Sequence, residues 1–162
     1  MNRAFFFKIL RKNMKETPKV KIYEAWTAVA DGNRIELAAG WTPDEGRATV
    51  RSSDGGKVYD LSWRDKGQVF VSTDPATYWQ GYAGYPVVAV LMKLGRLPYD
   101  AEVAKEFAGV NWTELNKRMK RDYIRAVNEV ESERNIDREA ADEAAGRVLN
   151  ALNALNLTIK RK

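Results

Sequence analysis

Between residues 19 and 73 the alternation of apolar and polar residues predicts β-strands separated by tight turns. The alternation is clearest in "KVYDLSW", where Tyr59, Leu61 and Trp63 share one face. Segments rich in Asp and Gly, which tolerate the positive φ of hairpin turns, separate five such runs. These turn segments are ADGN (30–33), TPDEG (42–46), SDGG (53–56) and RDKG (64–67), and the runs are VKIYEAWTAVA, RIELAAGW, RATVRS, KVYDLSW and QVFVST. We therefore predict a five-stranded antiparallel β-meander.

After Asp74 the pattern changes and predicts helices, so residues 74–158 are expected to form a helical half. Asp74-Pro75 is suited to an N-cap followed by proline in the first turn of a short helix. The run PVVAVLMKL is apolar on nearly every side, which is typical of a buried helix, and Gly95 ends it. Asp100 and Gly109 bound a further short helix, YDAEVAKEFAG.

Two longer helices are predicted for the remainder of this half. Asn111 with Glu114 has the spacing of a capping box, and apolar residues then recur every three or four positions as far as Val130. Asp137 is the expected cap of the last helix. Because the break at residues 135–136 is short, we expect residues 112–134 and 137–156 to form an antiparallel helix hairpin.

The first 16 residues predict an amphipathic helix with a broad apolar arc opposite a basic one. Its apolar residues are Phe5, Phe6, Phe7, Ile9, Leu10 and Met14, and its basic residues are Lys8, Arg11, Lys12 and Lys15. We expect this helix to cover the meander, since one face of a single sheet must be buried. Docking to a partner or to a membrane surface is the alternative, with the membrane less favoured. With a basic tail at 159–162, the chain is predicted to form one α+β domain over residues 1–162.

Composition excludes several kinds of chemistry. The 162 residues include no His and no Cys, which removes disulfides, thiol nucleophiles, imidazole bases and Cys/His zinc sites. Neither a P-loop nor a G-x-G-x-x-G motif occurs. We expect no catalytic residues, no cofactor and no metal. The longest apolar run, YPVVAVLM, is too short to span a bilayer, and no signal peptide is recognisable, so a cytoplasmic location is expected.

Basic residues on the predicted hairpin form a candidate phosphate-binding or nucleic-acid-binding site. A run on the first hairpin helix would lie away from the apolar stripe, and the folded-back hairpin would bring the C-terminal tail beside it. The candidates are Lys117, Arg118, Lys120, Arg121, Arg125, Lys160, Arg161 and Lys162. Such a basic end would bind phosphate backbones without sequence preference. The net charge of +5 is modest, however, and a solvated helix face is the favoured interpretation of the run taken alone.

The stretch YWQGYAGYP (78–86) is the second candidate, located where the sheet ends and the buried helix begins. Some of its rings are expected to fill the seam between sheet and helices. Aromatic residues with polar tips in a glycine-containing loop are also common at interfaces, so Tyr78, Trp79, Tyr82 and Tyr85 are candidate partner-binding residues. The sequence thus predicts a small non-catalytic binding or interaction protein, with a protein partner or self-association. The alternative is a sequence-nonspecific nucleic-acid binder.

Overall fold

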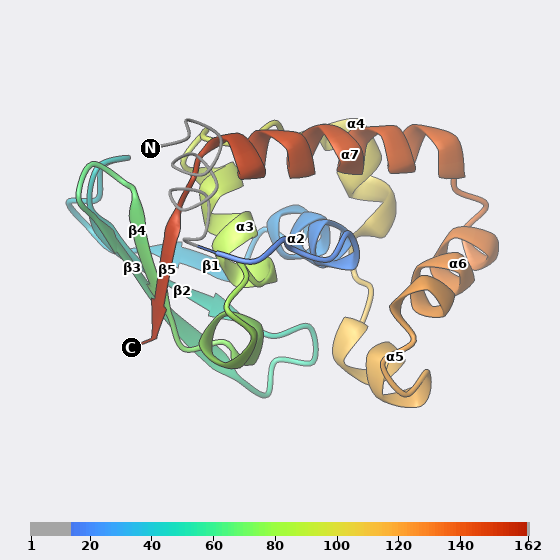
Figure 1. Cartoon of the computed structure of the whole chain (residues 1–162). Helices are drawn as coiled ribbons and strands as arrows, with labels where there is room; N and C mark the ends of the chain where they lie inside the picture. The colour runs from blue at the N-terminus through green and yellow to red at the C-terminus, as the bar shows by residue number, and fades with distance from the viewer. Residues whose placement is uncertain (1–13, 162) are drawn as a thin grey trace, which may run out of the picture.

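A computed structural model of the chain describes residues 14–161. Residues 1–13 of the predicted N-terminal amphipathic helix lie outside this range. The protein is α+β, with a five-stranded mixed sheet at one side and helices packed beside it (Figure 1). The strands lie in the order β1-β2-β3-β4-β5; the first four pair antiparallel, and the fifth pairs parallel to β4. Their bounds are β1 Ile35–Leu37, β2 Gly46–Arg51, β3 Val58–Arg64, β4 Val69–Ser72 and β5 Thr158–Arg161.

The predicted turns at 42–46, 53–56 and 64–67 are confirmed as the connections between consecutive antiparallel strands. The shared face of β3 is also confirmed: Leu61 and Trp63 are buried and Tyr59 is half-buried, whereas Val58 and Asp60 are exposed. The meander nevertheless has four strands, because its predicted first strand does not exist. The fifth strand of the sheet comes from the C-terminal tail, which makes the prediction of a wholly antiparallel sheet wrong.

Residues 20–30, predicted as a strand, form the helix α2 (Val20–Ala30) at the centre of the molecule. Every residue from Val20 to Ala28 is buried, so the helix lacks the polar face that would have revealed its period. The predicted hairpin turn ADGN instead ends this helix: Gly32 has φ 79° and donates its N–H to the Val29 carbonyl at 3.2 Å. A helix end and a hairpin turn both favour a residue with positive φ, so the same residue types serve either structure.

Three other helices begin at the caps that the sequence predicts. Asp100, Asn111 and Asp137 each accept a hydrogen bond from a backbone N–H of the first helical turn that follows. Pro75 precedes a short π-helical turn rather than an α-helix. The bounds are η1 Ala76–Gln80, α3 Tyr85–Lys93, α4 Ala101–Ala104, the 3-10 turn η2 Lys105–Phe107, α5 Trp112–Arg118, α6 Tyr123–Glu133 and α7 Arg138–Ala154.

The predicted antiparallel helix hairpin is wrong. Residues 112–134 form two helices, α5 and α6, because Lys120 and Arg121 adopt left-handed backbone conformations with φ 53° and 64°. Asp122 then caps α6 by accepting from the Arg125 N–H at 3.1 Å. Figure 1 shows α7 running over α2 and α4 instead of alongside α6. The small buried residues of α7, such as Ala141 and Ala145, permit this close packing.

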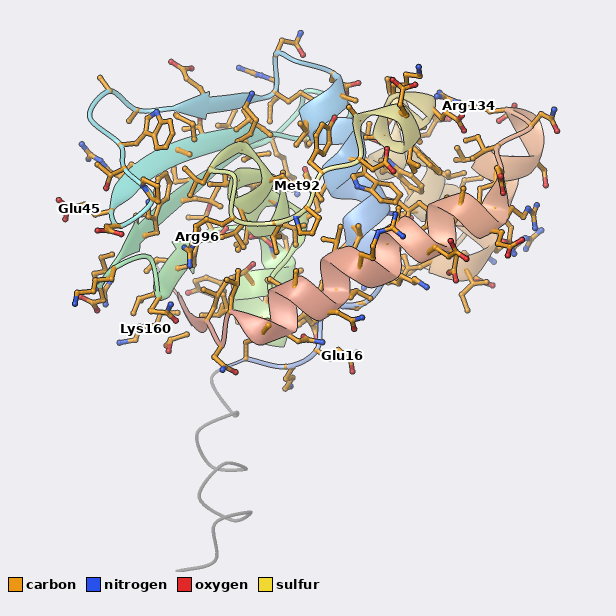
Figure 2. The ribbon with its side chains drawn as sticks, turned by 90° about the horizontal axis from the view of Figure 1, so that it is seen from above. Glu16, Glu45, Met92, Arg96, Arg134 and Lys160 are labelled. Carbon is orange, nitrogen blue, oxygen red and sulfur yellow. The ribbon has the colours of Figure 1, made fainter. Side chains whose placement is uncertain are left out.

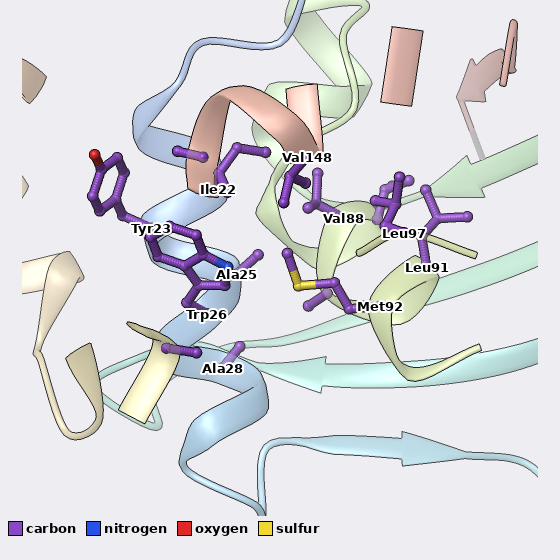
Figure 3. Close-up of a cluster of buried hydrophobic side chains, with 14 of the residues drawn as sticks. Ile22, Tyr23, Ala25, Trp26, Ala28, Val88, Leu91, Met92, Leu97 and Val148 are labelled. Carbon is purple, nitrogen blue, oxygen red and sulfur yellow. The ribbon is translucent and has the colours of Figure 1, made fainter. Parts of the chain in front are cut away.

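The core is centred on α2 and α3, which pack against each other beside the sheet. Figure 3 shows Met92 of α3 pointing toward Ala25 of α2. The prediction that α3 is buried on nearly every side is confirmed, since all residues from Pro86 to Met92 are buried. No helix within residues 14–161 has both the length and the apolar character needed to cross a membrane.

Candidate functional site

A cleft of about 600 Å³ opens where α2, β3, η1 and the α5–α6 turn meet, and we call it the Glu24 cleft. Its volume is in the range typical of small-molecule sites. Its lining includes the aromatic side chains Tyr59, Trp79, Tyr82, Tyr85, Trp112 and Tyr123. Its charged lining residues are Lys21, Glu24, Asp74 and Arg121. The cleft therefore combines aromatic walls with a small set of polar groups.

The polar floor of the cleft consists of two buried residues of α2, Lys21 and Glu24, and the half-buried Asn116 of α5. Lys21 and Glu24 are three residues apart on α2, which places them on one face, and Lys21 Nζ lies 3.1 Å from Glu24 Oε2. Asn116 Nδ2 donates to the other carboxylate oxygen, Oε1, at 2.8 Å. Glu24 is 3% exposed. Nζ of Lys21 also lies 4.9 Å from the centroid of the Tyr123 ring, a cation–π contact.

Electrostatics keep Lys21 charged. Burial lowers the pKa of Lys21, but the attraction of the Glu24 carboxylate, with a smaller contribution from Tyr123, outweighs it and leaves the pKa raised above 10.5. Lys21 is therefore an ammonium group at neutral pH, held between a carboxylate and an aromatic face.

Two acceptor atoms of the floor are left unused by the residues that the structure describes. Glu24 Oε2 and Asn116 Oδ1 are both buried, and neither accepts a hydrogen bond from residues 14–161. Lys21 Nζ lies 3.1 Å from Glu24 Oε2, so this oxygen is paired with a cation. Buried acceptors are nearly always hydrogen-bonded in folded proteins. Both atoms are closed to solvent, so they are buried acceptors without a hydrogen bond from residues 14–161.

The aromatic stretch supplies one wall of the cleft. Trp79, Tyr82 and Tyr85 line it, and Trp79 is 66% exposed, more than most large aromatic side chains. Tyr78 does not line the cleft; its ring packs edge-to-face on Trp79, with the centroids 4.7 Å apart. The Tyr85 hydroxyl accepts from Arg34 Nη2 at 3.5 Å. The stretch therefore both joins sheet to helix and contributes rings to a cavity.

A buried hydrogen-bond network positions this stretch. Asp74 accepts from the Thr77 N–H at 3.0 Å and also contacts the Ser72 hydroxyl. The Thr77 hydroxyl in turn accepts from the Gly84 N–H at 3.0 Å. Gly84 must be glycine, because a Cβ there would lie 2.1 Å from Asp74 Oδ2. The wall is therefore fixed at both ends rather than carried on a loose loop.

The wall tyrosines are hydrogen-bond donors at neutral pH. Burial raises the pKa of Tyr59, Tyr82 and Tyr85 above the ordinary value of 10.0, with nearby charges contributing less. Each hydroxyl consequently keeps its proton across the physiological range.

The predicted basic residues divide between two parts of the molecule. Lys117, Arg118, Lys120, Arg121 and Arg125 are all exposed around the α5–α6 turn. Arg118 forms an ion pair with Glu129 at 3.1 Å, whereas the Arg121 N–H donates to the Asn116 carbonyl at 2.8 Å. Of this group only Arg121 lines the Glu24 cleft.

The tail cluster lies elsewhere, so the prediction that the two basic clusters meet is wrong. Lys160 and Arg161 pair with Val71 and Ser72 of β4, and Lys162 lies outside the described residues. Figure 2 shows Lys160 at the sheet end of the molecule and Arg134, which follows α6, at the opposite end. The reason is that the tail forms strand β5 instead of following the end of α7 toward α5.

Sequence reasoning missed the floor of the cleft. Lys21 and Glu24 fall in the segment predicted as a strand, and their three-residue spacing has meaning only on a helix. Nothing in the sequence around Asn116 indicates that its side chain contacts α2. Within residues 14–161 no group of three or more carboxylates gathers as a metal site would require.

The family model described as uncharacterised conserved protein UCP014422 matches residues 14–158, so the chain belongs to that family. No curated protein matches the chain. No solved structure matches it either.

Proposed function

We propose that this member of the family is a binding protein that takes a small polar ligand in the Glu24 cleft. The observation that carries the proposal is a cleft of about 600 Å³ that combines aromatic walls with a few charged lining residues. Small-molecule sites are typically clefts of this size, with mostly apolar walls and a few placed polar groups. Binding rather than catalysis is favoured because the chain has no His and no Cys.

The aromatic wall supports the same proposal. Trp79 exposes 66% of its surface beside the cleft, and a ligand seated there would cover part of this apolar area. Tyr and Trp side chains have few rotatable bonds, so ordering them on binding costs little entropy. The network around Asp74 and Gly84 also holds the wall in place before a ligand arrives. Such preorganisation favours affinity for a small molecule.

The test is a thermal-shift screen of the purified chain against a panel of nucleotides, sugars, amino acids and organic acids. Hits are followed by titration of tryptophan fluorescence. Asn116→Leu removes the amide at similar volume, and Trp79→Ala removes the wall ring, so both should weaken binding at least about tenfold. Trp41→Ala is the matched control, since Trp41 is 38% exposed and does not line this cleft. If no compound binds, or if Asn116→Leu and Trp79→Ala bind as wild type does, the proposal is rejected.

A second candidate function is sequence-nonspecific binding of nucleic acid at the α5–α6 turn. Its support is that Lys117, Lys120 and Arg121 are exposed, and none forms an ion pair with another described residue. Fluorescence anisotropy with unrelated oligonucleotides should then show similar affinities that fall steeply with salt. Changing all three to Ala should flatten the salt slope by about one unit per lost contact. Absence of binding at low salt would exclude this candidate.

We also propose that Trp79 contacts a protein partner or a second copy of this chain. A second copy or another protein covering this ring would shield it from solvent. Light scattering of the wild type and Trp79→Ala tests self-association directly. A concentration-dependent increase in mass that Trp79→Ala abolishes would support it, and a monomer at all concentrations would exclude it.

A further inference from the structure

A second cleft, of about 530 Å³, opens where the start of α2, α6 and the start of α7 meet, and we call it the Glu131 cleft. It is separate from the Glu24 cleft: Val20 and Tyr23 of α2 line it, whereas Lys21 and Glu24 line the other. We infer that the Glu131 cleft binds a small organic amine, with its ammonium group on the Glu131 carboxylate and its hydrocarbon body on the apolar wall. This inference does not rest on the proposed function.

Glu131 occupies a position of α6 that suits an apolar side chain. It follows Val127 by four residues, so the two share one helical face, and both are buried, with Glu131 only 5% exposed. Its carboxylate forms no hydrogen bond or ion pair with another residue of 14–161. The carboxylate is not sealed, however, because Glu131 lines the cleft and the closed-off polar atoms without a hydrogen bond belong to other residues. A buried carboxylate without a partner is costly, and a cation in the cleft would relieve that cost.

The other charged residues of the lining are already engaged. Lys19 pairs with Asp142, with Nζ and Oδ1 2.5 Å apart. Arg138 donates from Nη2 to the Asn128 carbonyl at 3.1 Å. Burial raises the pKa of Glu131, and the attraction of Arg138 offsets this only in part. Among the described lining residues, Glu131 is therefore the charged group left to bind a ligand, and its charge requires a cation.

The walls favour an amine with an apolar body. Ile124 lines the cleft and is 77% exposed, and Val20 lies in the wall as well. Figure 3 shows the Tyr23 side chain directed away from α3, and the ring lines the cleft, where an aromatic face attracts an ammonium group. A metal ion is disfavoured, because residues 14–161 contain no cluster of three carboxylates. A polyamine would leave its further charges over the apolar wall.

The inference is tested by amide NMR spectra of the isotope-labelled full chain during titration with benzylamine. Signals from residues 18–23 and 123–131 should shift. Benzyl alcohol has the same ring without the charge and should bind at least about tenfold more weakly, and benzoate should not bind. N-acetyl-lysine amide presents the ammonium group as a protein side chain would. Tighter binding of that probe than of benzylamine would assign the cleft to a protein partner and overturn the small-molecule assignment.

Two variants assign the contacts. Glu131→Gln should weaken benzylamine binding at least about tenfold while leaving the urea midpoint undiminished, because it removes a buried charge that has no partner. Glu133→Gln is the matched control, since Glu133 is exposed on the same helix and does not line the cleft. Ile124→Ala should weaken binding about threefold through the lost apolar contact. If Glu131→Gln unfolds, Glu131→Leu, which suits the apolar face of α6, replaces it.

The outcomes separate this inference from the proposed function. Equal binding of benzylamine and benzyl alcohol, equal effects of Glu131→Gln and Glu133→Gln, or no signal change with benzylamine would each overturn it. If Trp79→Ala abolishes benzylamine binding and Glu131→Gln does not, the amine occupies the Glu24 cleft, so the inference fails and the proposed function stands. If the compound panel shows no ligand that depends on Trp79 while benzylamine binding depends on Glu131, the proposed function fails and the inference stands.

Discussion

Replacing Lys21 by Met tests whether the floor of the cleft is a true buried ion pair. The side chains of Lys21 and Glu24 are 11% and 4% exposed, so the substitution leaves a carboxylate buried without its counter-charge. Removing one partner of such a pair typically costs about 3–5 kcal/mol. The cation–π contact with Tyr123 adds about 0.5–1 kcal/mol, whereas Met retains most of the aliphatic packing. We expect Lys21→Met to lower the free energy of unfolding by about 3 kcal/mol.

The double variant Lys21→Met, Glu24→Gln separates charge from packing. Gln keeps an oxygen for the Asn116 amide and removes the unpaired charge, so it should recover most of the loss. Urea unfolding near pH 7 measures both variants, and a coupling energy of about 2 kcal/mol is expected between the two sites. Lys19→Met is the control, since Lys19 pairs with Asp142 at the surface and should cost less than about 1 kcal/mol. A Lys21→Met cost below about 1 kcal/mol, or no recovery in the double variant, would refute the reasoning.

Three further changes test other parts of the structure. Gly84→Ala should destabilise the protein by about 1–3 kcal/mol, because the new Cβ would clash with Asp74 Oδ2. Gly146→Ala has open space on α7 and should stabilise the protein by about 0.5–1 kcal/mol. Melting curves measure both variants, and equal effects would contradict this prediction. Leu157→Ala should cost about 2–5 kcal/mol in urea unfolding, since Leu157 is fully buried where the chain enters β5; a cost below about 1 kcal/mol would contradict that burial. Burial raises the pKa of Tyr59 and Tyr85 in the folded state, so the unfolded state should lose these protons first and stability should fall as pH rises above about 10. Tyrosinate absorbance follows the ionisation of the tyrosines, and urea unfolding at about pH 8 and 11 measures the stability. An unchanged urea midpoint between the two pH values would contradict the prediction.

Local signals in the sequence determined much of the architecture. The turn residues at 42–46, 53–56 and 64–67 predict the four-stranded meander, because Asp and Gly act through their own backbone conformations. Asp100, Asn111 and Asp137 predict helix starts for the same reason, since a cap bonds to a backbone only three residues away. The aromatic stretch 78–86 is also identifiable from the sequence as a candidate binding segment.

The remaining features of the fold depend on tertiary structure, and each wrong prediction about them has a physical cause. Residues 20–28 are all buried, so their pattern carries no helical period, and the β-branched and aromatic residues among them favour a strand locally. Strand β5 pairs with β4 across the whole helical half, and no local pattern specifies so distant a partner. The break between α5 and α6 depends on positive φ at Lys120 and Arg121, residue types that give no warning of it.

The candidate site follows from these three features: the helical conformation of residues 20–30, strand β5, and the break between α5 and α6. Lys21 and Glu24 meet because residues 20–30 are helical, and Asn116 reaches them because α5 stops short and turns. The basic tail is absent from the site because it forms β5. Charge and aromatic content are properties of the sequence and were identifiable from it. Which of those side chains share one cleft depends on contacts between residues as many as 92 positions apart, and only packing of the whole chain selects them.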